Sequence, residues 1–325
     1  MKKNTYYFII IILLVFSGSA NAKTLKKVTL LLQWTPQAQF AGIYMAEERK
    51  IFEKYGLDVN VIHANANEDS LDILIDEKVD FATSFLISGI IKNSKKKPIV
   101  NICQIVNKSN VMLIAWKNKN INSIYDMNGA KVSTWYGSIG FPVVSIFKDY
   151  KIDIKKYTQT ESISLFAKGG VDVCSAMLYN EYNLLYYAGI DYDEINTFTL
   201  SDYGYNFPED AIFCLKDKWK KDPSISKALS NAVMEGWKIA ALDQNSAKEA
   251  VRKRLNKAQK EQSIYHTNYM LNTILKSIIP DKKENWKIGY LKESDYNNCL
   301  KMLKSNYSDD IYSPDHNDFF KGRTQ

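Results

Sequence analysis

The chain has 325 residues, of which 46% are hydrophobic and 24% charged, and its formal net charge is +7 at neutral pH. This length allows two ordinary domains or one large one, and the composition is that of a globular protein. Basic residues are interspersed with acidic ones, and the lysines at 95–97 are typical of a solvated loop, so no basic stripe indicates a nucleic-acid partner.

The first 22 residues have the order of a cleavable secretory signal. Lys2 and Lys3 form a positive start, residues 6–16 are mostly apolar, and small residues end in Ala20-Asn21-Ala22. A membrane anchor is the alternative, but this run is much shorter than the ~20 residues that span a bilayer. No cysteine lies near the cleavage point to carry a lipid, and no later segment is apolar enough to span. We therefore predict export to the periplasm, with cleavage after Ala22.

Strand and helix patterns alternate along the first half of the mature chain. Apolar or alternating runs predict strands at 28–34, 57–62, 79–82, 99–106 and 111–116. Amphipathic runs predict helices at 42–55, ended by Gly56, and at 69–77. This alternation is typical of an α/β layer with a largely parallel sheet.

A second pass of the same plan follows from about residue 120. We predict strands at 131–134, 157–160, 171–176 and 211–215, and helices at 140–150 and 162–168. Residues 71–82 and 163–174 share one build, a short amphipathic helix, a turn and a Val-Asp strand, which fits two lobes of like topology. A long helical region runs from Ser224, a candidate N-cap, to about residue 302. The residues from 308 on are polar and are expected to be loosely held.

The cysteines and histidines indicate neither a metal site nor a cofactor site. Cysteines are scattered without a Cys-x-x-Cys pair, and the three histidines are equally isolated. Three of the cysteines lie in apolar strand-like runs, which favours buried free thiols. An exported chain can form disulfides, so one bridge remains open at this point. The cysteines are Cys103, Cys174, Cys214 and Cys299.

Residues 32–46 (LQWTPQAQFAGIYMA) and 51–59 (IFEKYGLDV) resemble the opening of NMT1/THI5-like (SsuA/THI5-like) substrate-binding proteins of ABC transporters. Residues 79–82, 128–132 and 207–213 match later landmarks in the same order, so the resemblance covers about 27–260. It implies a type 2 periplasmic-binding-protein fold of two α/β lobes joined by two crossing strands, with ligand between them. The crossings would fall near Ala115-Trp116 and Phe213-Cys214. Lobe 1 would contain 23–117 and 215–325, and lobe 2 would contain 118–214.

The resemblance also implies a function. A family member of this kind is a periplasmic binding protein that captures a small heterocyclic nutrient, foremost a thiamine pyrimidine precursor. It would be a monomer and deliver its ligand to an ABC permease in the inner membrane. Flavin precursors and alkyl sulfonates are alternative ligands, and a ligand-sensing module that docks on a membrane receptor is an alternative role. One branch of the family is enzymatic, but its cysteine-rich motif is absent here and its members are not exported, so we expect no catalysis.

Strand ends in α/β sheets supply ligand sites, and such sites combine aromatic walls with a few polar groups. The segment after the first strand offers Trp34 to stack on a ring and Gln37 or Gln39 to hydrogen-bond to it, and the alternative is that Trp34 only caps the core. Ser84 follows the third strand, where a simple N-cap is the alternative. Residues 135–138 join a strand to a helix whose N–H groups could receive an anion.

The loop after the strand at 171–176 carries the charged candidate. In pyrimidine-binding relatives it supplies an aromatic residue and a glutamate, and Tyr179 and Glu181 occupy these places. A carboxylate there can accept N–H bonds from an aminopyrimidine edge, whereas the alternative is a surface glutamate at a helix start. Asp210 has either a ligand role or a hinge-anchoring one. The predicted ligand-binding set is Trp34, Gln37, Phe40, Tyr44, Ser84, Trp135, Tyr136, Gly137, Ser138, Tyr179, Glu181 and Asp210.

Overall fold

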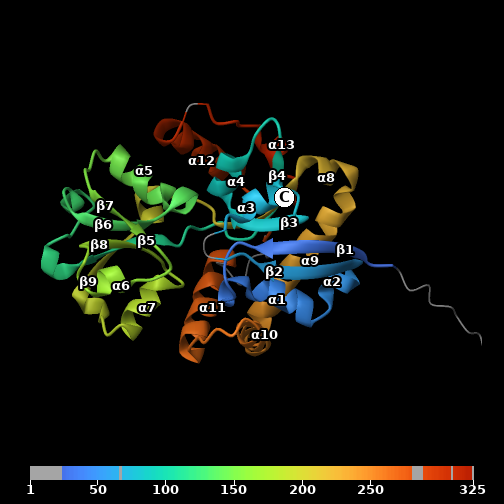
Figure 1. Cartoon of the computed structure of the whole chain (residues 1–325), viewed down its shortest axis with the longest axis horizontal. Helices are drawn as coiled ribbons and strands as arrows, with labels where there is room; N and C mark the ends of the chain where they lie inside the picture. The colour runs from blue at the N-terminus through green and yellow to red at the C-terminus, as the bar shows by residue number, and fades with distance from the viewer. Residues whose placement is uncertain (1–23, 66–67, 280–287, 309, 324–325) are drawn as a thin grey trace, which may run out of the picture.

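The computed structural model describes residues 24–65, 68–279, 288–308 and 310–323. The predicted signal peptide lies outside these residues. The described part forms two lobes, each built on a five-stranded mixed sheet with helices packed around it (Figure 1). Figure 1 shows one lobe with its sheet coloured green to yellow on the left, and the other with blue and cyan strands on the right.

The first sheet has the order β2-β1-β3-β10-β4. Its strands are β1 (Lys26–Leu32), β2 (Leu57–His63), β3 (Phe81–Phe85), β4 (Ile99–Gln104) and β10 (Asp210–Leu215). Strand β1 pairs in parallel with β2 and β3, whereas β10 runs antiparallel to both β3 and β4. Strands β3, β4 and β10 are buried along their whole length, which explains why their sequences are mostly apolar.

The second sheet repeats this plan with the order β7-β6-β8-β5-β9. Its strands are β5 (Val111–Trp116), β6 (Lys131–Trp135), β7 (Lys155–Gln159), β8 (Val173–Met177) and β9 (Ile195–Thr199). Strand β6 pairs in parallel with β7 and β8, and β5 is antiparallel to β8 and β9. The repeated segments 71–82 and 163–174 lead into β3 and β8, which hold the same third place in their sheets.

The positions of β5 and β10 correct the predicted lobe boundaries. Strand β5 follows the first lobe in the chain but pairs in the second sheet, and β10 returns to the first sheet. The connections between the lobes therefore lie at 105–110 and 200–209, and not after residues 117 and 214. An apolar strand fits the centre of either sheet, so sequence pattern alone does not show which sheet it joins.

Helices surround both sheets. Their bounds are α1 (Ala41–Glu48), α2 (Ile51–Lys54), α3 (Ser70–Ile75), α4 (Leu86–Lys92), α5 (Phe141–Asp149), α6 (Ser164–Ala167), α7 (Glu181–Tyr187), α8 (Lys216–Lys221), α9 (Pro223–Leu242), α10 (Gln244–Lys257), α11 (Ile264–Ile278), α12 (Glu293–Asn306) and α13 (His316–Phe319). Short 3-10 helices include η1 (Ala38–Phe40) and η4 (Gly137–Gly140). Figure 1 places α12 near α5 at the top and α11 near α7 at the bottom, and both pairs are in contact.

Three local predictions are wrong. The predicted helix 42–55 is interrupted at Lys50, whose φ of 52° separates α1 from α2. Asp222 caps α9 by accepting from the Ser224 backbone N–H, so Ser224 is not the N-cap. Residues 319–320 are not loosely held, because Phe319 is buried and Phe320 forms a bridge to Asn101 of β4. Aromatic residues in a polar stretch were the available signal for this contact.

Helices α1 and α9 cross at two glycines. A Cβ on Gly42 would lie 2.2 Å from the Trp237 indole, and a Cβ on Gly236 would lie 2.1 Å from the Gly42 carbonyl oxygen. The missing side chains let the two backbones approach closely, and Trp237 fills the space beside them with 1% of its surface exposed. This crossing ties the C-terminal helices to the first lobe.

The cysteines Cys103, Cys174, Cys214 and Cys299 are buried, as predicted, and they are free thiols in the described structure. Among the described residues, no cluster of three His, Cys, Asp or Glu side chains is arranged to hold a metal ion. In the same residues, no helix combines the length and apolar character needed to cross a bilayer.

Candidate functional site

A cavity between the two lobes is the candidate ligand site. Its volume is about 430 Å³ when the solvent at its mouth is included. The space inside it that holds the centres of water-sized groups is only about 60 Å³, well below the roughly 300–1,000 Å³ of ligand pockets. The first lobe supplies Gln33, Trp34, Gln37, Gln39 and Phe85, and the second supplies Trp135, Ile139, Met177, Tyr179, Asn180 and Glu181.

Aromatic side chains from both lobes form the walls. Trp34 follows β1 and is half-buried, whereas Trp135 ends β6 with 9% of its surface exposed. Phe85 ends β3, and Tyr179 follows β8. These side chains extend from strand ends because the carboxyl ends of parallel strands meet at one edge of each sheet. Flat aromatic walls of this kind suit a planar ring, which stacks against them.

Glu181 is the one charged side chain among the residues that line this cavity. It is 5% exposed and begins α7. Its Oε2 accepts from the Met177 backbone N–H at 2.9 Å, and its Oε1 accepts from the Asn180 amide at 2.9 Å. Burial raises the pKa of this carboxyl group, while these hydrogen bonds oppose the rise. Each oxygen keeps a further lone pair that can accept a hydrogen bond from a ligand.

A chain of glutamines connects the opposite wall to Asp210. Gln39 Nε2 donates to both carboxylate oxygens of Asp210, at 2.9 and 2.8 Å, and Gln33 Nε2 donates to Asp210 at 2.7 Å. Gln37 in turn donates to Gln39. Burial raises the pKa of Asp210 to about 7, even though these donors stabilise its charged form. Asp210 therefore lies behind the cavity wall and orients the amide groups of Gln33 and Gln39, which line the cavity.

Five predicted site residues lie together on the cavity wall: Trp34, Gln37, Trp135, Tyr179 and Glu181. Six lining residues lie outside the predicted ligand-binding set, although Gln39 was an alternative to Gln37: Gln33, Gln39, Phe85, Ile139, Met177 and Asn180. Gln39 and Asn180 are adjacent to predicted positions and polar, which is the signal that could have found them. Phe85, Ile139 and Met177 carry only an apolar side chain, and such residues look like core in any sequence.

The structure places the remaining predicted residues elsewhere. Tyr136 is 85% exposed and does not line the cavity, because it follows Trp135 with the opposite side-chain direction of an extended chain. Gly137 is exposed beside it. Ser138 shares a hydrogen bond with Ser88 of the first lobe. Ser84 is buried in β3 opposite Ala211 and does not line the cavity.

Phe40 and Tyr44 are core residues that support Trp34 from behind. Tyr44 is fully buried, and its hydroxyl group lies 3.1 Å from His63 Nε2. His63 Nδ1 lies 2.6 Å from the Trp34 carbonyl oxygen, so Nδ1 carries the proton and Nε2 accepts from Tyr44. Phe40 packs edge-on against the same imidazole ring. Phe40 and Tyr44 were predicted to bind the ligand, but both side chains are buried in the core and do not line the cavity.

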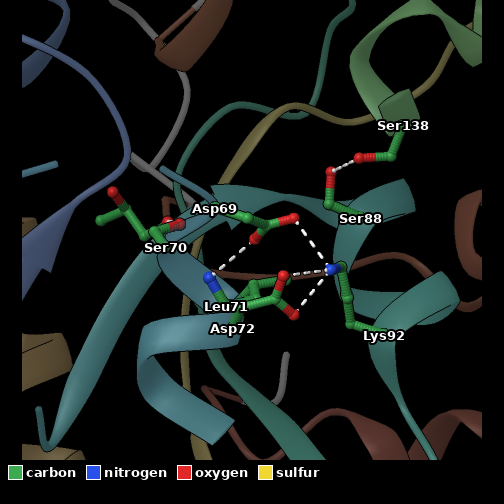
Figure 2. A network of polar contacts seen from close by, with 8 residues as sticks. Asp69, Ser70, Leu71, Asp72, Ser88, Lys92 and Ser138 are labelled. Carbon is green, nitrogen blue, oxygen red and sulfur yellow. Dashed lines mark hydrogen bonds and ion pairs between the residues drawn. The ribbon is translucent and has the colours of Figure 1, made fainter. Parts of the chain in front are cut away.

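The lobes also touch beside the cavity. Ser88 of α4 and Ser138 of η4 share a hydrogen bond of 2.6 Å between their hydroxyl groups (Figure 2). Next to it, Lys92 pairs with Asp72 at 2.6 Å and with Asp69 at 3.2 Å, within the first lobe. Figure 2 shows this ion pair on one side of Ser88 and the Ser138 contact on the other. Exposed ion pairs of this kind contribute little stability. The serine hydrogen bond, in contrast, joins the two lobes beside the cavity.

A buried carboxylate connects the two crossing segments. Glu209, 2% exposed, accepts from the Asn110 backbone N–H and from the Asn110 amide, the latter at 2.9 Å. Ser109 also donates to it at 3.4 Å. Burial raises the pKa of Glu209 to about 8, with the neighbouring Asp210 charge as a smaller cause. The two segments that connect the lobes are thus joined by buried hydrogen bonds of Glu209 with Ser109 and Asn110. These polar groups lose their contact with water when the chain folds.

We expect the free energy of unfolding to fall as pH rises from 5.5 to 8.5. Glu209 holds its proton in the folded state up to about pH 8 but loses it near pH 4.5 when unfolded. Its contribution is therefore full below the unfolded pKa and is lost as pH rises through the folded pKa, by on the order of 2 kcal/mol. Urea unfolding at three pH values should show a shallower fall for Glu209→Gln. Equal slopes for both proteins would contradict this assignment.

A second hollow lies at the end of α10 and the start of α11. Its lining includes Arg252, Lys260 and Glu261, and its volume is about 800 Å³ with open solvent included. These charged side chains are exposed, and no aromatic wall lines it. A wide, solvated hollow holds a small molecule poorly, so we assign the ligand site to the cavity between the lobes.

Comparison with known proteins identifies the family to which this chain belongs. Residues 37–247 match the family model described as NMT1/THI5 like. A putative thiamine biosynthesis protein of Haemophilus influenzae is 26% identical over 141 residues, which are 43% of this chain and 44% of that protein. A formylaminopyrimidine-binding protein of Halalkalibacterium halodurans is 22% identical over 232 residues, which are 67% of this chain and 68% of that protein.

Related enzymes are also found. A 4-amino-5-hydroxymethyl-2-methylpyrimidine phosphate synthase of Saccharomyces cerevisiae is 20% identical over 133 residues, which are 41% of this chain and 39% of the enzyme. The chain thus spans less than half the length of the Haemophilus and Saccharomyces relatives that it matches.

The periplasmic aliphatic sulphonate binding protein SsuA of Escherichia coli has a similar structure, with a TM-score of 0.69. The two sequences are 12% identical, and the match covers 87% of this chain and 92% of the other. This similarity confirms the type 2 periplasmic-binding-protein fold. Because the family model matches more than half of the chain, this protein belongs to the NMT1/THI5-like family.

Proposed function

We propose that this protein is the periplasmic substrate-binding component of an ABC importer and that it captures a thiamine pyrimidine precursor. The observation that carries the proposal is a buried carboxylate, Glu181, in a small cavity with aromatic walls. A planar 4-aminopyrimidine would stack on Trp34 or Trp135. Its amino group and protonated ring nitrogen would donate to the free lone pairs of Glu181 in charge-assisted bonds.

The charge of the cavity favours a cationic or neutral ligand over an anion. Among the described residues, no Lys or Arg side chain lines it, and its one ionisable acid is Glu181. A sulfonate or nitrate would bring a second negative charge beside this buried carboxylate without a cation to offset it. The similarity to a sulphonate-binding protein therefore supports the fold and not that ligand.

The same features support binding without catalysis. The described residues contain no metal-binding cluster, and the thiols of the cysteines are buried with pKa values raised by burial. The named relatives include both a pyrimidine-binding protein and pyrimidine phosphate synthases, and the binding protein matches over the longer stretch. We therefore propose that the ligand leaves unchanged, for an ABC permease of the inner membrane, and that the binding protein acts as a monomer.

A ligand panel tests the proposal. Thermal unfolding should shift upward with 4-amino-5-hydroxymethyl-2-methylpyrimidine or with formylaminopyrimidine, because a ligand at 100 times its Kd stabilises the folded state by about 2.7 kcal/mol. Ethanesulfonate, nitrate and riboflavin serve as controls and should give no shift. Stabilisation by ethanesulfonate alone would contradict the pyrimidine assignment, and mass spectrometry of the recovered ligand would reveal any turnover.

A further inference from the structure

Helix α11 of the first lobe contacts the ligand-site segment of the second lobe, residues 178–183. The Tyr269 hydroxyl group donates to the Leu178 carbonyl oxygen at 2.8 Å. His266, one turn earlier and 4% exposed, lies between two asparagines of that segment. Its Nε2 is 3.0 Å from Asn180 Oδ1, and its Nδ1 is 2.8 Å from Asn183 Nδ2. Tyr179, Asn180 and Glu181 of the same segment line the cavity.

The hydrogen bonds around His266 define one tautomer. Asn180 Nδ2 donates to Glu181, so its Oδ1 faces the imidazole and accepts from Nε2–H. Asn183 Oδ1 accepts from the Tyr192 hydroxyl group at 3.5 Å, so its Nδ2 donates to His266 Nδ1. A neutral ring protonated on Nε2 satisfies both contacts. The Glu181 carboxylate is thus connected through Asn180 to a residue of the opposite lobe.

We propose that His266 is a proton-controlled latch between the lobes: its neutral ring joins α11 to residues 180–183 and orients Asn180 toward the ligand-binding carboxylate of Glu181. It is a positioning residue, since it acts on the ligand through Asn180. The assignment concerns control of the proposed ligand site and so rests on the proposed function for its biological role.

Protonation of His266 opposes closure of the lobes. An imidazolium ring has two donors, and its Nδ1–H would face the Asn183 amide, another donor. Rotation of that amide would give up the long bond from Tyr192. The other titratable groups that face the ring are Tyr187, whose ring packs edge-on at 6.0 Å, and Glu181, reached through Asn180. No carboxylate among the described residues pairs with the ring, and burial lowers the pKa of His266.

The direction of the pH effect follows from this lowered pKa. An exposed histidine in the open form has a pKa of about 6.5. Above that pH the ring is neutral in both forms and the latch is complete. As pH falls below it, the open form takes up the proton first, so the closed form is lost by up to about tenfold per pH unit. Closure, and with it ligand affinity, should weaken between pH 7 and 5.5.

Three variants separate the latch from other titrating groups. His266→Gln keeps an amide N–H for Asn180 but takes up no proton, His266→Ala removes the contact, and His316→Gln is the matched control away from the cavity. With 4-amino-5-hydroxymethyl-2-methylpyrimidine at pH 7.5, His266→Gln should stay within about threefold of wild type, and His266→Ala should bind about tenfold more weakly. From pH 7.5 to 5.5 the wild type and His316→Gln should lose about tenfold more affinity than His266→Gln. Equal losses in wild type and His266→Gln would overturn the proposal.

A ligand-free measurement tests the latch independently of the proposed function. The chain has three histidines, so ¹H–¹⁵N correlation of ¹⁵N-histidine protein assigns each ring by single substitution. His266 should be the neutral Nε2–H tautomer at pH 7.5, and the radius of gyration should increase at pH 5.5 in wild type but not in His266→Gln. This result without pyrimidine binding would sink the proposed function alone. Pyrimidine binding with an Nδ1–H tautomer and unchanged scattering would sink the latch alone.

Discussion

Replacing Glu181 with glutamine is expected to weaken binding of 4-amino-5-hydroxymethyl-2-methylpyrimidine by about 1–3 kcal/mol, or roughly 5- to 150-fold. Both carboxylate oxygens already accept from protein donors, the Met177 N–H and the Asn180 amide. A glutamine has one acceptor oxygen, so its NH₂ group would face one of these donors. The variant therefore loses both the charge-assisted bonds to the ligand and one supporting bond.

Isothermal titration calorimetry measures this loss directly. Glu161→Gln is the matched control, because it removes the same charge from an exposed position of the second lobe. It should bind as the wild type does. Trp34→Ala should also weaken binding, through lost stacking area, and should leave the fold intact. If the pyrimidine binds equally well to Glu181→Gln, Trp34→Ala and wild type, the ligand site is elsewhere, although the fold and family remain.

Trp237→Ala is expected to lower the free energy of unfolding by about 3–5 kcal/mol, the usual cost of truncating a buried aromatic residue. The indole fills the space next to Gly42 at the crossing of α1 and α9, and it is 1% exposed. Because protein interiors are closely packed and relax only in part, the variant leaves a cavity. Its indole N–H has no hydrogen-bond partner in the described structure, so Trp237→Phe should cost less.

Urea unfolding at pH 7 measures the free energy of unfolding of Trp237→Ala and Trp237→Phe. Leu242→Ala is the matched control, since it truncates a large apolar residue on the same helix that is 77% exposed. It should change the free energy of unfolding by less than about 0.5 kcal/mol. A similar loss in Trp237→Ala and Leu242→Ala would show that the helix crossing contributes little to stability.

The alternating α/β pattern predicted an α/β fold with an internal repeat, and the resemblance to a family supplied the two-lobed arrangement. Buried strands such as β3 and β8 are mostly apolar, and amphipathic helices leave a regular period, so both are visible in the local sequence. The residues at 32–59 added the resemblance to a family, and the family model confirms that family. Trp34 and Glu181 were also predictable, since each follows a strand end where α/β proteins place ligand groups.

Only the tertiary structure decided how distant residues combine. Tyr44 and Trp34 lie in one segment, yet burial turns Tyr44 into a support through His63 while Trp34 lines the cavity. Strand β5 joins the second sheet because of its pairing partners, which no local pattern records. The contact of His266 with Asn180 joins residues 86 positions apart. Periodicity determines which face of an element is buried, but the partner of that face depends on how the whole chain packs.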